Sequence, residues 1–414
     1  MALIVTPTRG MKDFLPDEVV KREQVKKVIL DTYSSFGFKP VETPAVEHLH
    51  LLNNGEGGEN EKLIFKILKR GEKLKDGLSD NESLSDSALR YDLTVPLSRF
   101  YANNKGILPK PFKVIQIGPV WRAERPQKGR LRQFIQCDID VLGNEGIEAE
   151  IDLLTASGTA LRNLGFNDFS MNFNDRRVLY AMADFCGYDK DEYNSFFITL
   201  DKLDKIGVEG VLKELSSNSF SEAKVFKTEE LIKYLVREEV EITKLNEILE
   251  GKISEEIIYN LNLLKDTLSE LGYSCIFDPI LVRGMSYYTG TIFEFKYKNY
   301  PGSIGGGGRY DKMIEKMVGE SIPACGFSIG FERIINIMEE ESRVIGKDIR
   351  NLALLYDNNK LSDVYKVLYK LVENEYNVSV LKKGKKLGKQ LKSLKDQGFS
   401  YYMIFGEEGI KEMI

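Results

Sequence analysis

The 414-residue sequence predicts an α+β protein in which a strand-rich part is interrupted by a long helical segment and followed by a small α/β unit. Three observations lead to this prediction. Residues 112–122 and 134–142 have the pattern of two paired strands, and the second alternates apolar and polar positions. Residues 175–272 repeat apolar positions at helical spacing. From residue 351 onward, strand and helix patterns alternate, as in a small domain with a parallel sheet.

The first predicted element is a helix at residues 17–37, where apolar side chains recur at helical spacing and Gly37 provides a stop. FKPVETPAVEH, which follows, contains two prolines and predicts a short extended segment. The polar, Gly- and Ser-rich stretch 71–88 predicts a loop. Further expected elements are a helix at 146–164, glycine-marked strands within 277–310 and an amphipathic helix at 328–341. The predicted domains are 1–174 together with 273–342, then 175–272, and 350–414.

The composition narrows the class of protein. The net charge is −5, yet residues 351–414 contain 11 lysines and 8 acidic residues, which favours either a polyanion partner at that end or a solvated helix face. No run of about 18 apolar residues is present, so no membrane span is expected. The four cysteines contain no CxxC pair, which indicates reduced thiols in the cytoplasm and no structural zinc site. Because His48 and His50 are the only histidines, neither a histidine-rich metal site nor a conventional catalytic triad is expected.

Charge is distributed unevenly in WRAERPQKGRLRQFIQCDID, residues 121–140. Five lysines and arginines lie between positions 122 and 132, and Gln136, Asp138 and Asp140 follow. Strand alternation places these three on one sheet face and the apolar set that begins at Ile135 on the other. Two antiparallel strands joined by a long basic loop are the simplest arrangement. The pattern indicates a phosphate-bearing ligand beside a cationic or hydrogen-bonding group.

Four separated stretches carry a resemblance to a known family: ALRYDLTVPLSR, WRAERPQKGRLRQFIQCDID, LVRGMSYYTGTIFEF, and SIGGGGRYD with ACGFSIGFERI after it. Together they resemble the histidyl-tRNA synthetases, which are class II aminoacyl-tRNA synthetases. The resemblance runs from GMKDFLPDE to the last strand. It implies a catalytic domain of antiparallel sheet flanked by helices, an inserted helical domain and a C-terminal domain that reads the anticodon. The N-terminal helix and the Pro44 segment resemble the motif that builds a homodimer interface.

The resemblance implies that histidine reacts with ATP to give histidyl-adenylate and pyrophosphate, and that histidine then passes to the 3′ end of its tRNA. ATP would enter with Mg²⁺, and no tightly bound cofactor or resident metal would be needed. Because a carboxylate must attack the α-phosphate, positioning and cations do most of the work, and arginine suits this role. The implied ATP contacts are the catalytic Arg122 and Arg283 at the α-phosphate, Arg333 at the far phosphates, and also Glu124 and Arg130.

The amino-acid substrate accounts for the acidic residues. An α-ammonium needs acceptors, and an imidazole needs an acceptor for its ring N–H. Such partners discriminate strongly, because a substrate without ring nitrogens leaves them unpaired. By resemblance, the histidine-binding set consists of Asp92, Thr94 and Gln136 at the α-amino end, Asp140, Tyr288 and the nearby Tyr310 at the imidazole, the more structural Tyr287, and the arginines Arg122 and Arg283.

Two further features concern phosphate groups. The basic loop resembles one that meets ATP and the tRNA acceptor end, which assigns Arg125, Gln127 and Lys128 to tRNA. Seven lysines between positions 382 and 395 are candidates for contacts to tRNA phosphates.

The glycines at 305–308 leave room for a ligand to approach the backbone. Their spacing does not fit GxGxxG, because a tyrosine stands at the third glycine position, so a dinucleotide fold is not expected.

The sequence departs from the family pattern in three places. Asp92 and Asp140 stand where many members have glutamate, so the pocket backbone must lie closer to the substrate or a water must bridge the gap. Ser286 stands where aspartate is common, and it is assigned no role. The chain ends sooner than the resemblance implies, so a shortened C-terminal domain is expected: either its final strand is absent or the sequence stops before it, and both alternatives put the affinity for the anticodon in doubt.

Two other functions fit parts of the sequence. A paralogue of this family is the regulatory subunit of ATP phosphoribosyltransferase in histidine biosynthesis, which keeps the fold without charging tRNA. It has no need for Arg283 or for the ERPQKGR loop. A nucleic-acid-binding module without catalysis would use the lysine-rich end but leaves Gln136, Asp140 and Tyr288 unexplained. The intact arginine and loop favour the synthetase.

Overall fold

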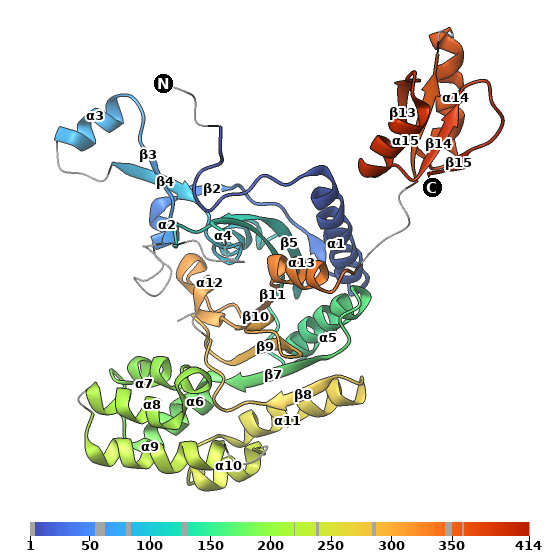
Figure 1. The fold of residues 1–414 in the computed structure, drawn as a ribbon. Helices are drawn as coiled ribbons and strands as arrows, with labels where there is room; N and C mark the ends of the chain where they lie inside the picture. Colours follow the sequence, from blue (N-terminus) through green and yellow to red (C-terminus); the bar gives the residue numbers. More distant parts are fainter. Residues whose placement is uncertain are drawn as a thin grey trace. The chain divides into compact units, whose positions relative to one another are not determined.

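The computed structural model describes residues 5–53, 63–79, 84–125, 131–218, 220–236, 240–283, 287–343, 350–357 and 360–413. Their contacts divide the chain into two compact units, Met1–Val344 and Ile345–Ile414, each of which has its own sheet (Figure 1). Within the residues so described, no helix combines the length and the apolar character needed to cross a membrane.

The first unit is built on an eight-stranded sheet (Figure 1). Its strands are β1 Lys39–Pro40, β5 Phe112–Trp121, β6 Gln133–Leu142, β7 Phe169–Asp175, β8 Ser274–Phe277, β9 Thr291–Tyr297, β10 Ser303–Arg309 and β11 Ala324–Ile329. They lie in the order β1-β5-β6-β11-β10-β9-β7-β8. The pairings from β5 to β7 are antiparallel, whereas β1–β5 and β7–β8 are parallel. The expected antiparallel sheet is confirmed at its centre, and the edges make it mixed.

The hairpin of β5 and β6 carries most of the polar residues singled out in the sequence. The two faces predicted for β6 are confirmed: Gln136 bonds to Asp138, two residues along on one face, and Cys137 and Ile139 are fully buried on the other face, which two helices cover. These helices are α1, Pro16–Ser35, and α5, Glu148–Asn163 (Figure 1). The opposite face of β6 is therefore the one that carries its polar side chains.

Residues 71–88, expected to form a loop, contain a helix and a strand instead. α3 spans Glu72–Ser79, and β4, Ser85–Leu89, lies between β2, Val46–His48, and β3, Lys66–Leu68, in a small antiparallel sheet. The prediction was wrong because this segment is polar and carries no strand pattern of its own. Its strand is stabilised by hydrogen bonds to partners that are distant in the sequence, which composition does not reveal.

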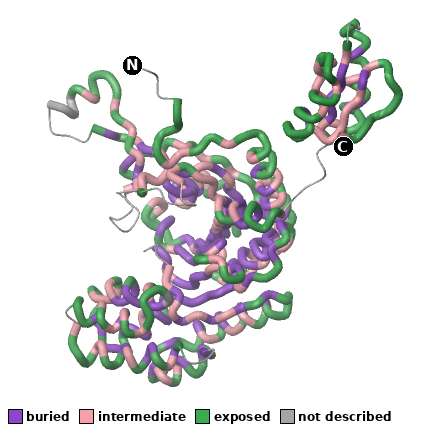
Figure 2. Tube along the Cα trace, viewed as in Figure 1, coloured by how far each residue is buried: buried purple, intermediate pink, exposed green. Residues whose placement is uncertain are grey.

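The chain between β7 and β8 is helical, as its apolar spacing predicted. The helices are α6 Arg176–Cys186, α7 Tyr193–Leu200, α8 Leu203–Ser217, α9 Glu222–Leu235, α10 Ile242–Ile248 and α11 Glu255–Glu270. On α11, Ile257, Leu261, Leu264 and Leu268 form a buried stripe at helical spacing. Figure 2, in which buried residues are purple, shows buried and exposed residues mixed along the helices of this segment. This connection returns the chain to the same end of the sheet, which is why β7 and β8 are parallel.

The helix α13, Phe331–Glu340, is fixed to α1 by an ion pair. Arg22 of α1 donates to both carboxylate oxygens of Glu332 at 2.7 Å, and its guanidinium lies 4.0 Å from the Phe14 ring. Glu332 also accepts a hydrogen bond from the backbone N–H of Ile135 in β6 at 3.2 Å. These contacts hold the first turn of α13 against the central sheet.

The remaining helices of the first unit are α2 Leu49–Asn53, α4 Thr94–Asn104 and α12 Asp311–Val318.

The second unit is a four-stranded sheet in the order β13-β12-β14-β15, with one helix on each face. Its elements are β12 Asn351–Tyr356, α14 Leu361–Glu373, β13 Asn377–Lys382, α15 Leu387–Asp396, β14 Tyr401–Ile404 and β15 Lys411–Glu412. Leu352 and Leu354 pack against α14, and Ala353 and Leu355 pack against α15. The predicted strand–helix order and the parallel pairing are confirmed, and β15 adds an antiparallel edge strand that was not expected.

Candidate active site

The strand register aligns the candidate residues on one face of the central sheet. In β6, Gln136, Asp138 and Asp140 point to the face opposite Cys137 and Ile139. The pairings continue this face across β11, β10 and β9. One row consists of Gln116, Asp138, Ser328, Gly306 and Glu294, and the next of Val114, Asp140, Gly326, Gly308 and Ile292. Residues from three of the quoted motifs thus form one polar wall.

The glycine-rich strand β10 makes room for side chains that lie over it. A Cβ on Gly306 would lie 2.8 Å from Cζ of Arg283, and a Cβ on Gly308 would lie 2.8 Å from Cδ1 of Tyr288. Both distances are too short for a real Cβ contact, so a larger residue at either position displaces the side chain above it. Arg283 and Tyr288 thus lie close to the backbone of these glycines, and the approach of a ligand to the same backbone stays a prediction.

Asp140 is deeply enclosed in the wall. Its Oδ1 accepts a hydrogen bond from the Tyr310 hydroxyl at 2.6 Å, and both side chains are buried. Gly326 lies directly opposite on β11, where a Cβ would lie 2.0 Å from that oxygen. Burial raises the pKa of Asp140 to about 7, although the Tyr310 hydrogen bond acts in the opposite direction. The rings of Tyr287 and Tyr288 pack edge to face with their centroids 4.8 Å apart.

A second set of acceptors lies at the start of α4. Asp92 Oδ1 accepts from the Val95 backbone N–H at 3.1 Å, whereas its Oδ2 is buried and has no hydrogen-bond partner among the described residues. Burial raises the pKa of Asp92 to about 6, against the effects of the Val95 bond and of the positive charge on Arg122. Thr94, half-buried, is the first residue of the helix. The carboxylate of Asp92 therefore has one oxygen bound to backbone and one available.

Gln136 and Arg122 complete this side of the wall. Gln136 Nε2 donates to both carboxylate oxygens of Asp138, at 3.2 and 3.4 Å, and Gln136 Oε1 is buried without a partner among the described residues. Arg122 Nε donates to the Tyr91 carbonyl at 3.1 Å. The structure thus offers two unpartnered acceptors, on Asp92 and Gln136, and the charge of Arg122 acts on Asp92 and on Asp138, the hydrogen-bond partner of Gln136. An ammonium beside a carboxylate group would satisfy these three features together.

Asp138 belongs to this wall, although no role was assigned to it from the sequence. It is 4% exposed, and burial together with the charge of Asp140 raises its pKa well above the usual range, while a hydrogen bond from Ser328 acts in the opposite direction. The sequence signal that could have identified Asp138 is its position midway between Gln136 and Asp140, on the same face of an alternating strand. Among the described residues, no group of three or more His, Cys, Asp or Glu side chains is arranged to hold a metal ion.

The arginines lie along β10. Arg283 forms an ion pair with Glu294 of β9, with 3.1 Å between Nη1 and Oε2. Its charge opposes the effect of burial, which raises the pKa of Tyr288 to about 12. Arg333 is exposed in the first turn of α13 and donates to the backbone carbonyl of Ser303, where β10 begins. Arg283 is therefore part of the wall, whereas Arg333 lies toward the outer end of the same strand.

The basic loop between β5 and β6 is described only at its two ends. Near β5, the backbone carbonyl of Glu124 accepts from Arg132 Nε at 2.9 Å, and Arg125 is exposed. Outside the described residues lie Gln127, Lys128, Arg130 and Ser286. The contacts assigned to these loop residues stay predictions.

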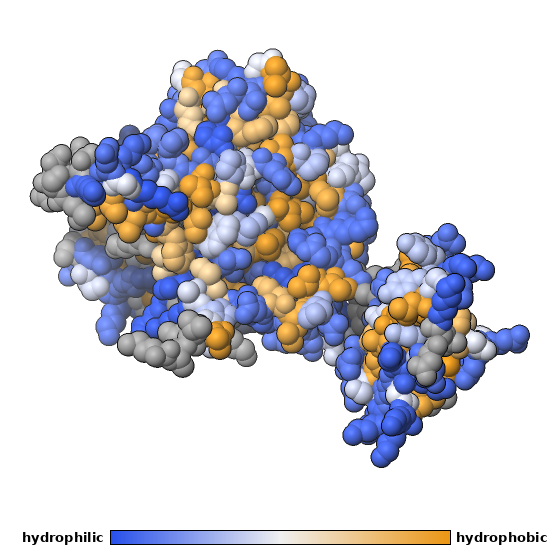
Figure 3. All heavy atoms as spheres, turned by 90° about the horizontal axis from the view of Figure 1, so that it is seen from above, coloured by the Kyte–Doolittle hydropathy of each residue, from blue (hydrophilic) through white to orange (hydrophobic). Residues whose placement is uncertain are grey.

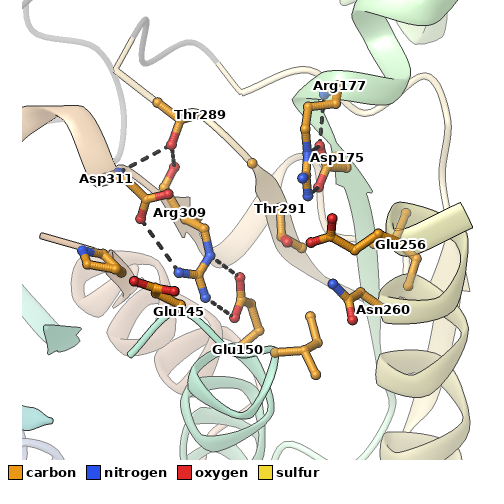
Figure 4. A pocket seen from close by; sticks show the side chains of 14 residues that line it. Glu145, Glu150, Asp175, Arg177, Glu256, Asn260, Thr289, Thr291, Arg309 and Asp311 are labelled. Carbon is orange, nitrogen blue, oxygen red and sulfur yellow. Dashed lines mark hydrogen bonds and ion pairs between the residues drawn. The ribbon is translucent and has the colours of Figure 1, made fainter. Parts of the chain in front are cut away.

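A buried ion pair holds the C-terminal end of β10 on the face of the sheet opposite the polar wall. Arg309 donates Nε and Nη2 to Glu150 of α5, each at 2.7 Å, and its backbone carbonyl accepts from the Thr289 N–H at 2.8 Å (Figure 4). A polar pocket opens beside this pair, lined among others by Glu145, Asp175, Arg177, Glu256, Asn260 and Thr291 (Figure 4). Because consecutive strand residues point to opposite faces, anchoring Arg309 on the α5 side directs Tyr310 toward Asp140.

The buried carboxyls give the ligand-free chain a predictable pH dependence. Asp92 and Asp140 have pKa values of about 6 and about 7 in the fold, against an ordinary 3.8, so the folded chain holds more protons than the unfolded chain between these limits. Stability should therefore fall as the pH rises from about 4 to about 7. In Asp140→Asn the fall should be shallower, and at pH 7 the variant should be more stable by on the order of 4 kcal/mol. Denaturation midpoints of both proteins, measured from pH 4 to pH 7, test this prediction. If the midpoints of the variant and of the unsubstituted chain change equally with pH, the prediction is contradicted.

The fold and the polar wall together define a class of protein. A sheet that is antiparallel at its centre and flanked by helices, with arginines and acceptors on one face, is the arrangement of class II aminoacyl-tRNA synthetases. The chain is similar to the crystal structure of histidyl-tRNA synthetase from Nostoc sp. PCC 7120, with a TM-score of 0.81 and 25% identity over 98% of this chain and 92% of that one. The histidyl-tRNA synthetase family model matches residues 10–334, and the chain belongs to this family.

Curated relatives agree with this assignment. The histidine–tRNA ligase of Leifsonia xyli subsp. xyli is 44% identical over 368 residues, which cover 86% of this chain and 85% of the relative. That of Christiangramia forsetii is 36% identical over 423 residues, with 98% and 92% covered. A Bacillus halodurans structure described as an ATP phosphoribosyltransferase regulatory subunit/histidyl-tRNA synthetase has a TM-score of 0.76 at 18% identity, which shows a shared fold.

Proposed function

We propose that this chain is a histidine–tRNA ligase. It activates histidine with ATP to form histidyl-adenylate and pyrophosphate, and it then transfers histidine to the 3′ end of its tRNA. The observation that carries the proposal is the polar wall, in which Arg122 and Arg283 stand beside the buried acceptors of Asp92, Gln136 and Asp140. This combination suits a substrate that brings a carboxylate, an ammonium and a ring N–H into one site.

The arginines would act on the phosphate side of the reaction. The histidine carboxylate attacks the α-phosphorus of ATP, and negative charge builds on the phosphoryl oxygens while pyrophosphate leaves. Arg283, held over β10 by Glu294, and Arg122, held by the Tyr91 carbonyl, are fixed before substrate arrives, so little reorganisation is needed in the transition state. Arg333 would contact the outer phosphates. We also propose that ATP binds as its Mg²⁺ complex and that Glu124 and Arg130 contribute to ATP binding.

The acidic residues would select histidine. Asp92, Thr94 and Gln136 would bind the α-ammonium, and Asp140 with Tyr288 would bind the imidazole. The Tyr310 hydroxyl occupies one lone pair of Asp140 Oδ1, which orients that carboxylate for its second partner. An amino acid without ring nitrogens would leave these buried groups unpaired, and this is the expected source of specificity.

Transfer RNA would be bound by separate parts of the chain. We propose that Arg125, Gln127 and Lys128 contact its acceptor end and that the second unit, residues 350–414, contacts the anticodon end. In that unit Lys385, Lys386, Lys389 and Lys392 are exposed around the start of α15. Figure 3 shows hydrophilic residues around the apolar ones on the visible face of this unit. We further propose a catalytic domain formed by 1–174 and 273–342, a helical insertion at 175–272, a homodimer and a cytoplasmic location.

The alternative, a regulatory subunit of ATP phosphoribosyltransferase, has less support. The relatives that are 44% and 36% identical over most of their length are named as ligases. The neighbour whose description includes the regulatory subunit shares 18% identity and supports the fold alone.

Histidine-dependent ATP–pyrophosphate exchange tests the proposed function. The purified full chain with Mg²⁺ and ATP should incorporate labelled pyrophosphate into ATP when histidine is added and should not do so with glutamine or phenylalanine, which match its size without the ring nitrogens. Charging of tRNA with histidine should follow in the same preparation. A folded chain that gives no histidine-dependent exchange would overturn the proposal.

A further inference from the structure

The amide of Gln136 has a definite direction in the wall. A glutamine side chain has a donor end and an acceptor end of nearly the same shape, so its neighbours decide which way it turns. Here Nε2 lies 3.2 and 3.4 Å from the two oxygens of Asp138. In its ionised form the Asp138 carboxylate accepts from an NH₂ group and repels an amide oxygen, and the hydrogen bond from Ser328 favours that form. Gln136 Oε1 is consequently turned away from Asp138, and it is buried without a partner among the described residues.

Asp138 is itself fixed by its surroundings. It is 4% exposed, and it lies opposite Ser328 on β11, whose hydroxyl bonds to it, and opposite Gln116 on β5. Gln116 is already committed, because its Nε2 donates to the Leu93 carbonyl at 2.9 Å and its Oε1 accepts from Thr43 at 3.2 Å. The amide of Gln136 is therefore not in competition with Gln116 for the Asp138 carboxylate.

We propose that Asp138 is a positioning residue for recognition of the substrate ammonium: by holding Nε2 of Gln136, it presents Oε1 of Gln136, together with Oδ2 of Asp92, as a pair of acceptors. This inference rests on the proposed function, since it assigns the ammonium of an amino acid to that pair. Asp138 does not touch the ammonium in this arrangement. It acts through Gln136, and it makes the wall selective for a cation that has several N–H donors.

The variant Asp138→Asn tests the inference. Asparagine keeps the shape, but its NH₂ group can bond to Gln136 Oε1 and so turn the donor end of Gln136 toward the substrate. The histidine KM should rise by about tenfold to a hundredfold, the loss expected for a charged hydrogen bond, whereas the ATP KM should not change. The probe for the mechanism is 3-(imidazol-4-yl)propanoate, which is histidine without its ammonium. Its inhibition constant should be the same in the variant and in the unsubstituted chain.

Two double variants examine the route through Gln136. Glutamate has an oxygen at both ends, so Gln136→Glu combined with Asp138→Asn should restore much of the histidine affinity. In a Gln136→Ala background, Asp138→Asn should have little further effect, because the group that it positions is absent. Asp152→Asn is the matched control, since Asp152 is a half-exposed carboxylate paired with Lys113 at 2.9 Å on α5, outside the wall. If Asp138→Asn does not fold, Ser328→Ala should weaken histidine binding in the same direction and spare the analogue.

The outcomes separate this inference from the proposed function. Equal weakening of histidine and the analogue in Asp138→Asn would show a general packing role and would overturn the inference, as would a full effect of Asp138→Asn in the Gln136→Ala background. Binding of histidine and of the analogue is also measured by calorimetry without ATP. A chain that binds histidine in an Asp138-dependent way but shows no exchange would sustain the inference about the ammonium site while overturning the ligase activity.

Discussion

Replacing Arg283 with alanine should slow histidine-dependent ATP–pyrophosphate exchange by about two to three orders of magnitude. The guanidinium lies over Gly306, in the same wall as Asp138 and Asp140, and Glu294 holds it at 3.1 Å. A cation fixed there stabilises the charge that develops on the α-phosphoryl oxygens during the reaction. Because that charge is greatest in the transition state, kcat should fall much more than the histidine KM changes.

Two variants make the Arg283 result interpretable. Arg283→Lys keeps the charge but loses the forked donors, so its exchange rate should lie between those of the alanine variant and the unsubstituted chain. Arg350→Ala removes an exposed arginine from the second unit and should leave exchange unchanged. Near-normal exchange by a folded Arg283→Ala protein would show that this arginine does not act on the α-phosphate.

The second large effect is expected at Asp140. Asp140→Asn should raise the histidine KM by roughly 10- to 150-fold, which corresponds to the 1.5–3 kcal/mol of a hydrogen bond to a charged group. Asparagine can still accept from Tyr310, but it removes the negative charge that favours a bond from the imidazole N–H. Steady-state exchange at varied histidine concentration measures the change. The ATP KM should stay constant, because the substitution lies on the amino-acid side of the wall.

Asp152→Asn is again the matched comparison, and it should leave the histidine KM unaltered. Tyr310→Phe removes only the hydroxyl that orients Asp140, so its effect should be smaller than that of Asp140→Asn. If Asp140→Asn binds histidine as tightly as the unsubstituted chain, another group must receive the ring N–H. The thermal midpoints of all three variants, measured without ligand, show whether any loss of affinity arises from unfolding.

The strands and helices with strong periodicity could be predicted from local pattern. In β6, alternation identified the face that carries Gln136 and Asp140, because side chains of a strand point to opposite sides whatever its partners are. Residues 71–88 show the limit of this reasoning, since β4 there depends on pairing with β2 and β3 and has no pattern of its own. The resemblance supplied the remaining assignments, and it left Asp138 without a role.

The sequence by itself determined the type of most elements, the two faces of β6 and the family of the chain, because these follow from residue spacing and from motifs that lie within single segments. Only the tertiary structure decided which residues share the wall. The register between β6, β11, β10 and β9 brings Asp140 opposite Gly326 and Asp138 opposite Ser328, and it brings Arg283 over Gly306. Strand register depends on hydrogen bonds between distant segments, and a shift of one residue would turn every side chain to the other face.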